Sequence, residues 1–176
     1  KKGLGTDLED PLAIMKRGYY ISITLAGVAF FFVCKYFLYT STVPYAYLYF
    51  FGCGFTGIMV SFMILLVTQY YTDYHFAPVI HIAKSSKMGH ATNIIAGIAN
   101  GLESTGLPVL IISFAILFSH YLGENAGFVN EHGEKIGGLF GTAIATMGMF
   151  ATGVYVLSMS GFGPIADNAG GIVEMS

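Results

Sequence analysis

The feature that most constrains this chain is a long stretch without any ionised side chain. Residues 36–72 contain no Asp, Glu, Lys or Arg, and residues 18–34 contain none either. A membrane-crossing helix needs roughly 20 consecutive apolar residues. Only helices or closed barrels satisfy their backbone hydrogen bonds in lipid, and these runs lack the alternation of barrel strands. The chain is therefore predicted to be an all-α integral membrane protein.

A proline and two polar loops divide the sequence into four predicted spans. Pro44 marks a turn after the first span, and the third span contains Glu103 and Pro108, so we expect it to be long and interrupted. The segment is predicted to have about four transmembrane helices and to be part of a larger helical bundle. The four spans cover about residues 18–39, 45–71, 91–122 and 137–162.

Composition excludes several other classes of protein. Charged residues make up 10% of the 176 residues, whereas a soluble domain has about a quarter. A net charge of −2 without a Lys/Arg-rich run argues against a nucleic-acid partner. No GxxxxGK[ST] loop is present, so nucleotide binding is not expected. Cys34 and Cys53 lie in apolar runs without CxxC spacing, and we expect them to pack rather than to form a disulfide or a zinc site.

Basic residues predict the orientation. Residues 1–17 and 73–90 carry six Lys or Arg, including Lys1, Lys2 and Lys84, whereas the loops on the other side carry only Lys35 and Lys135. Basic residues are enriched in cytoplasmic loops, so the N-terminus should be cytosolic, and four crossings return the C-terminal stretch to the same side. The chain also begins on a residue other than Met and ends abruptly, so we expect it to be a segment of something longer.

The C-terminal stretch "GPIADNAGGIVEMS" is unusually polar for this chain. On a helix Asp167 and Glu174 are two turns apart and point roughly the same way. Two carboxylates facing a cytosolic cavity would suit Mg²⁺, which binds one or two carboxylates plus phosphate oxygens and water. The alternative is a capped, solvated helix start, since Pro164 fits a first helical turn and an Asp-Asn pair is a common cap. Spacing alone leaves both interpretations open.

Two further polar residues lie in or near the predicted spans. Glu103 is about 18 Å along the third span, where a charge is costly and normally faces a partner or water. It is either a proton-relay or ion-path residue, or one half of an ion pair with a helix outside this segment. Gly97, Gly101 and Gly106 favour close packing against a neighbouring helix there. Gln69 ends the second span and is followed by Tyr70, Tyr71 and Tyr74, which are typical of an interfacial aromatic belt.

Four sequence stretches resemble one known family. "VTQYYTDYHFAPV", "GHATNIIAGIANGLESTGLP", "GGLFGTAIATMGMFATGVYVLSM" and "FGPIADNAGGIVEMS" are similar, in order and spacing, to consecutive motifs of the membrane-bound, ion-translocating inorganic pyrophosphatases. "GLEST" resembles the potassium-independent, proton-pumping type II enzymes, because a lysine takes the place of Glu103 in the other type. Gln69 departs from the glutamate that often precedes the paired tyrosines, which puts an ion-coupling role of this position in doubt.

The resemblance implies a homodimer of helical bundles that hydrolyses Mg²⁺–pyrophosphate in a cytosolic funnel and couples hydrolysis to proton transport. It implies a multi-pass protein of an endomembrane of vacuolar, Golgi or acidocalcisome-like type. The matched motif makes Asp167 a magnesium ligand that binds the substrate through Mg²⁺, with Asn168 and Glu174 around it. The other aspartate- and lysine-bearing motifs are absent, so this segment alone should neither hydrolyse pyrophosphate nor pump.

Two other functions remain as alternatives from the residues alone. A segment of a secondary transporter would account for interrupted helices and an acidic residue within a span. A structural subunit of a membrane complex would need no chemistry of its own. Phosphate release from pyrophosphate by the full-length protein, dependent on Mg²⁺, would separate the first interpretation from both.

The orientation can be tested by labelling. A cysteine introduced at Ser86, in the basic loop, should react with an impermeant thiol reagent added from the cytosolic side only, because this loop is predicted to be cytosolic. Labelling from the opposite side would contradict the predicted topology.

Overall fold

The computed structural model describes residues 11–130 and 132–176, and this part of the chain is built from helices with no β-strand. The all-α prediction is confirmed. Lys1 and Lys2, which contribute to the basic count, lie outside the described residues. Cys34 and Cys53 are both free and buried, as the sequence predicts.

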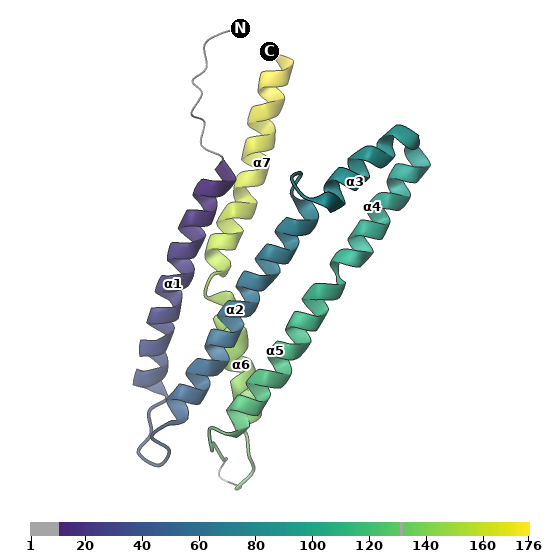
Figure 1. Ribbon diagram of the computed structural model, residues 1–176. Helices are drawn as coiled ribbons and strands as arrows, with labels where there is room; N and C mark the ends of the chain where they lie inside the picture. The colour runs from purple at the N-terminus through teal and green to yellow at the C-terminus, as the bar shows by residue number, and fades with distance from the viewer. Residues whose placement is uncertain (1–10, 131) are drawn as a thin grey trace.

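The helices run as long antiparallel rods (Figure 1). The start of α1, the end of α7 and α3 lie at one end of the bundle, and we call this the terminal end. The turns at residues 38–45 and 125–136 lie at the opposite end, the turn end. In chain order the elements are α1 Pro11–Phe37, α2 Ala46–Thr72, α3 Ala77–Ser85, a 3₁₀ turn Ser86–Met88, α4 His90–Ser104, α5 Gly106–Glu124, α6 Gly137–Phe150 and α7 Gly153–Met175.

Four helical stretches are long and apolar enough to cross a membrane. They cover Ile14–Phe37, Ala46–Met88, His90–Glu124 and Gly137–Met175. The last three have 43, 35 and 39 residues, more than the roughly 20 that span a bilayer. Counting about 20 residues from the turn end places the far boundary of the hydrocarbon near Arg17, Leu66, Ser104 and Leu157. The terminal ends of the later helices therefore extend beyond the hydrocarbon.

Close backbone contact joins α6 to α2 and to α5, and we call this contact zone of the three helices the seam. A Cβ at Gly57 would collide with the backbone oxygen of Ala145, and a Cβ at Gly148 with that of Gly54. Small residues allow such approach in membranes, where van der Waals packing replaces the hydrophobic effect. The buried residues of the seam include Ala46, Phe50, Cys53, Ala126, Ile144 and Ala145.

The glycines expected to mark close packing are not the ones that do so here. A Cβ at Gly97, Gly101 or Gly106 would meet nothing within 4 Å in the described part of the chain. Their helix faces look away from the seam, and the close contacts fall instead on glycines of α2, α5 and α6.

The third span is interrupted, as predicted. Helix α4 ends at Ser104 and α5 begins at Gly106. Pro108 has no amide hydrogen and cannot donate to the Ser104 carbonyl four residues earlier. The hydroxyls of Ser104 and Thr105 bond back to the carbonyls of Gly101 and Leu102 at 2.8 Å, a pattern that bends helices.

The fourth span breaks at a different place from the one expected. The prediction that Pro164 begins a helix is wrong, because α7 continues through Pro164 to Met175. The break lies at residues 151–152, where the buried Thr152 hydroxyl bonds the Ser61 hydroxyl of α2 at 3.0 Å instead of capping its own helix. Pro164 removes one amide donor from α7, and the helix continues through it; Gly153 next to Thr152 is a poor helix former.

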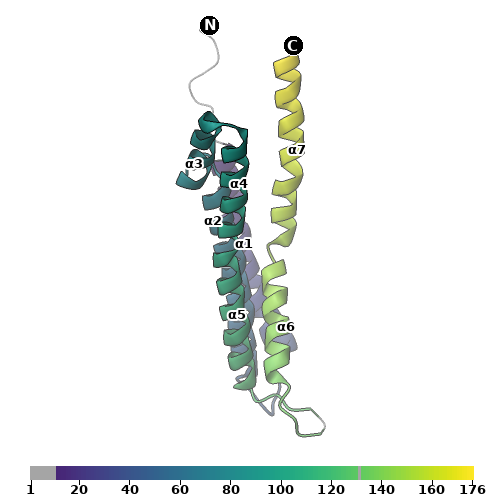
Figure 2. The same cartoon turned by 90° about the vertical axis from the view of Figure 1, so that its right-hand side faces the viewer.

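Helix α7 leaves the bundle beyond this break (Figure 2). Its lower part contacts α1, where the Tyr155 hydroxyl donates to the Met15 carbonyl at 2.8 Å. No residue of α7 is buried by the rest of the described chain. The terminal half of α7 is therefore a free-standing helix beside a well-packed base.

The seam can be tested with two alanines on one helix. Gly57→Ala should lower the thermal unfolding midpoint of the purified protein in detergent, because the overpacking cost of about 1–3 kcal/mol exceeds the gain of about 1 kcal/mol in helix propensity. Gly52→Ala is the matched control on α2, since its Cβ would meet only the flexible end of Leu122. Equal midpoints for the two variants, followed by circular dichroism, would contradict the backbone contact.

Candidate functional site

The acidic residues of the C-terminal stretch lie on one exposed side of α7. Asp167, Asn168 and Glu174 are all exposed and lie inside a regular helix. A cap role for Asp167 is excluded, because the helix begins at Gly153, far from Asp167. The glycines also form no turn here: Gly170 and Gly171 are helical, and a Cβ at either would meet nothing within 4 Å. They leave open surface beside the carboxylates.

Helix α7 offers some, but not all, of the oxygen ligands that a hard cation needs. The Asp167 carboxylate makes no hydrogen bond or ion pair with the described residues, so its oxygens are available as metal ligands. Glu174 lies about 10 Å further along the axis, too far to share one Mg²⁺ with bonds of about 2.1 Å. No group of three His, Cys, Asp or Glu side chains that could hold a metal occurs within residues 11–130 and 132–176. Asp167 therefore fits as one ligand of an incomplete set.

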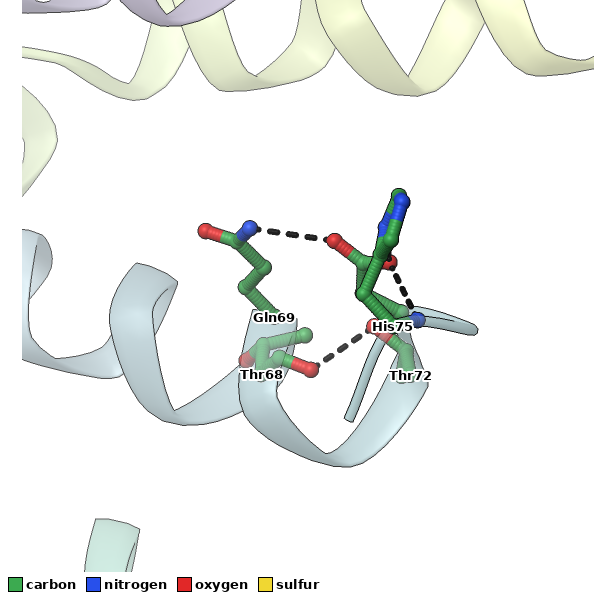
Figure 3. A network of polar contacts seen from close by, with 5 residues as sticks. Thr68, Gln69, Thr72 and His75 are labelled. Atoms are coloured by element: carbon green, nitrogen blue, oxygen red, sulfur yellow. Dashed lines mark hydrogen bonds and ion pairs between the residues drawn. The ribbon is translucent and has the colours of Figure 1, made fainter. Parts of the chain in front are cut away.

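A polar network closes the terminal end of α2. Gln69 Nε2 donates to Asp73 Oδ2 at 3.1 Å, and the backbone amide of His75 donates to Asp73 Oδ1 at 3.0 Å. His75 Nδ1 also lies 2.9 Å from Asp73 Oδ1. Figure 3 shows the side chains of Gln69 and His75 pointing from the end of α2 toward α7. The network joins the last turn of α2 to the loop that follows it.

Asp73 is an anion in this network. It lies beyond the end of α2, outside the predicted hydrocarbon region. Hydrogen bonds from the backbone amide of His75 and from the Gln69 and His75 side chains lower the pKa of Asp73 to about 2. A carboxylate that accepts several hydrogen bonds is stabilised in its charged form, so Asp73 is ionised throughout the physiological pH range.

A cavity of about 720 Å³ lies under this network, between α2, α1 and α7. Its deeper wall is apolar and includes Leu65, Met149 and Val156. Its polar lining includes Lys16, Ser61, Thr68, Gln69, Thr72, Asp73, His75 and Ser160. The lining of the cavity is thus mostly apolar and includes one fixed anion, one lysine and several hydroxyls.

Glu103 lies in the last turn of α4 and is exposed. Its Oε1 accepts a hydrogen bond from the Tyr71 hydroxyl at 3.4 Å. The Tyr71 carbonyl in turn accepts one from Asn100 Nδ2 at 3.4 Å. Tyr71 is only 8% exposed, so its assignment to an interfacial belt is wrong, whereas Tyr70 and Tyr74 are exposed at 43% and 72% as expected.

The predicted site residues do not form one cluster. No hydrogen bond or ion pair among the described residues links Asp167 to Gln69 or to Glu103. Sequence reasoning missed Asp73, Lys16 and the contact between Tyr71 and Glu103. The signal for Asp73 was present, because Gln69 and Asp73 are four residues apart and meet on one helical face. The contact between α2 and α4 had no such local signal.

Comparison with known proteins gives a consistent result. The family model described as inorganic H⁺ pyrophosphatase matches residues 2–176. The chain is 52% identical over 169 residues to "Pyrophosphate-energized membrane proton pump 3" of Arabidopsis thaliana, covering 96% of this chain and 21% of that protein. No solved structure matches the chain.

Two further relatives have names similar to that of the Arabidopsis protein. "K(+)-insensitive pyrophosphate-energized proton pump 2" of Moorella thermoacetica is 49% identical over 168 residues, covering 96% of this chain and 24% of the relative. "K(+)-insensitive pyrophosphate-energized proton pump" of Caldanaerobacter subterraneus is 45% identical over 171 residues, covering 96% of this chain and 24% of the relative. The chain spans about a fifth to a quarter of the length of these three relatives.

Proposed function

The chain belongs to the inorganic H⁺ pyrophosphatase family, and from this premise we propose that it is a section of a K⁺-insensitive pump. This pump hydrolyses inorganic pyrophosphate to phosphate and couples the reaction to proton transport across a membrane. The observation that carries the proposal is the match of the family model to residues 2–176. The names of relatives that are 45–52% identical support it. The same observation favours a pump over a secondary transporter or a non-catalytic subunit.

The proposed cofactor is Mg²⁺, with Asp167 as one of its ligands. Pyrophosphate carries a high negative charge, so a carboxylate-lined site would repel it unless divalent cations bridge the two. The unpaired, exposed carboxylate of Asp167 on α7 suits this role. A bound Mg²⁺ would polarise the phosphorus, and catalysis would then depend mainly on positioning and electrostatics. The remaining ligands would come from parts of the full-length protein outside this chain.

The proposal also includes the finer features implied by the family. The full-length protein would act as a homodimer in an endomembrane of vacuolar, Golgi or acidocalcisome-like type, with the terminal end in the cytosol. Glu103 would lie on the proton path, and Gln69 would serve mainly to fix Asp73, to which it donates a hydrogen bond. Asn168 and Glu174 would surround the Mg²⁺ ligand without binding the ion.

Asp167→Asn tests the catalytic proposal. In membranes with matched amounts of full-length protein, phosphate release from Mg²⁺–pyrophosphate should fall by about 100-fold, the upper end of losses seen on removing metal-supporting groups. Excess Mg²⁺ should not restore it, because the amide keeps the size but loses the charge. Glu174→Gln is the matched control on the same side of α7 and should retain most activity. Near-normal activity of Asp167→Asn would contradict the metal-ligand role.

Glu103→Gln tests the proton path. The number of protons moved per pyrophosphate hydrolysed should fall at least about tenfold, since a positioned proton-transfer group contributes 100-fold or more. Membrane insertion should be unaffected, because the substitution removes a charge. The readout is acidification of vesicles together with phosphate release. Glu124→Gln, at the other end of the same span, serves as the control, and unchanged pumping by Glu103→Gln would contradict the role.

A further inference from the structure

Tyr71 differs from the other tyrosines at the terminal end of α2. It is 8% exposed, whereas its neighbour Tyr70 is 43% exposed. The two rings meet edge to face, with centroids 5.0 Å apart and planes at 84°. The ring of Tyr71 is therefore held by packing, and its hydroxyl reaches α4 from a fixed position.

Among the described residues, the hydroxyl of Tyr71 donates to one group, the carboxylate of Glu103. Tyr71 Oη donates to Glu103 Oε1 at 3.4 Å. Within residues 11–130 and 132–176, this is the hydrogen bond that reaches the Glu103 carboxylate. Glu103 is otherwise exposed, so its second oxygen is open to groups beyond the described part of the chain.

A second contact keeps the two helices in register. Asn100 lies one turn before Glu103 on α4, and its amide donates to the Tyr71 carbonyl at 3.4 Å. The last turn of α2 is thus bonded to the last turn of α4 through both the backbone and the side chain of a single residue. This link sits immediately before the break between α4 and α5, where a glutamate side chain would otherwise be free to change rotamer.

We propose that Tyr71 is a positioning residue for Glu103, and that its hydroxyl holds one carboxylate oxygen so that the other is presented at a fixed place for proton exchange. The inference rests on the proposed role of Glu103 in proton transport. Proton transfer needs donor and acceptor atoms within about 2.6–3.2 Å. Holding the carboxylate of a glutamate at a helix end favours this geometry, and within the described part of the chain Tyr71 supplies the contact that holds Glu103 from another helix.

A structural role alone would have a different signature. Replacing Tyr71 by Phe keeps the ring, its burial and its contact with Tyr70, and removes only the hydroxyl. If the ring were what matters, Tyr71→Phe would behave as wild type. If the hydroxyl acts through Glu103, the effect of Tyr71→Phe disappears once the carboxylate has been replaced.

The experiment is a double-mutant cycle in full-length protein reconstituted into vesicles. Tyr71→Phe, Glu103→Gln and the double variant are compared for protons moved per pyrophosphate hydrolysed. Tyr71→Phe should lower this ratio by about threefold to tenfold, the range expected for one ordinary hydrogen bond. The double variant should be no worse than Glu103→Gln alone. Tyr70→Phe is the matched control and should leave the ratio unchanged. Thermal unfolding midpoints of the same variants measure the coupling between the two side chains without reference to activity.

Each outcome decides between the alternatives. Additive losses in the double variant, or a ratio for Tyr71→Phe equal to that for Tyr70→Phe, would overturn the positioning role. Coupling in the unfolding midpoints with an unchanged proton ratio would reduce the hydrogen bond to a structural contact and would also overturn it. Wild-type protein that releases no phosphate from pyrophosphate would instead overturn the proposed function, and the inference that rests on it.

Discussion

The backbone contact between α2 and α6 determines the shape of the rest of the molecule. Gly57 and Gly148 bring one helix against the carbonyl oxygens of the other, so no side chain separates the axes at these points. Contact this close holds only while both helices stay straight, and α6 ends at Phe150. Beyond that point α7 diverges, and the cavity lined by Asp73, Lys16 and Ser160 opens between the helices. The polar end of the molecule is thus a consequence of where the packed seam stops.

The two helix breaks separate a packed base from polar extensions. The α4–α5 break near Thr105 and the α6–α7 break at Thr152 both lie in the middle part of their spans, within about two helical turns of the same height by residue count from the turn end. Each has a local cause, the missing amide of Pro108 in one and the Thr152–Ser61 hydroxyl pair in the other. Glu103 and Asp167 are placed by the helices on the terminal side of these breaks. The breaks let those helices take directions that the seam does not impose.

Much of this architecture could be predicted from single-sequence patterns, because lipid imposes one simple rule on the backbone. The uncharged runs predicted the helices, and Pro108 predicted the interruption between α4 and α5. The exact partners could not be predicted. Whether a glycine such as Gly57 or Gly97 contacts another backbone depends on the rotation of its helix, which residue spacing does not encode. Pro164 misled for a related reason: an internal proline can either kink a helix or end it, residue spacing does not say which, and α7 continues through Pro164.

The candidate site shows the same division between local and long-range information. Asp167 stood out as an acidic residue in an apolar chain, and its place on an exposed helix removed the cap interpretation. Tyr71, in contrast, did not stand out, because its position between other tyrosines predicted an exposed residue of the interfacial belt. Its burial follows from the return of α4 alongside α2, a contact between residues far apart in the chain. No periodicity within either helix carries that information.

The seam also limits where a proton could cross. The polar groups along it are those of the buried Cys53, Ser119 and Thr152 and of the half-buried Ser61. Cys53 Sγ donates to the Ser119 carbonyl at 3.3 Å, and the hydroxyls of Ser61 and Thr152 bond each other. No Asp, Glu, Lys, Arg or His is buried among the described residues of this core, because an unpaired charge there would be costly. Among the described residues, the seam therefore offers a proton hydroxyl and thiol groups but no buried carboxylate, amine or imidazole. On this chain, the exposed face of α4 with the Glu103 carboxylate is the surface from which a proton path that serves the proposed function can start.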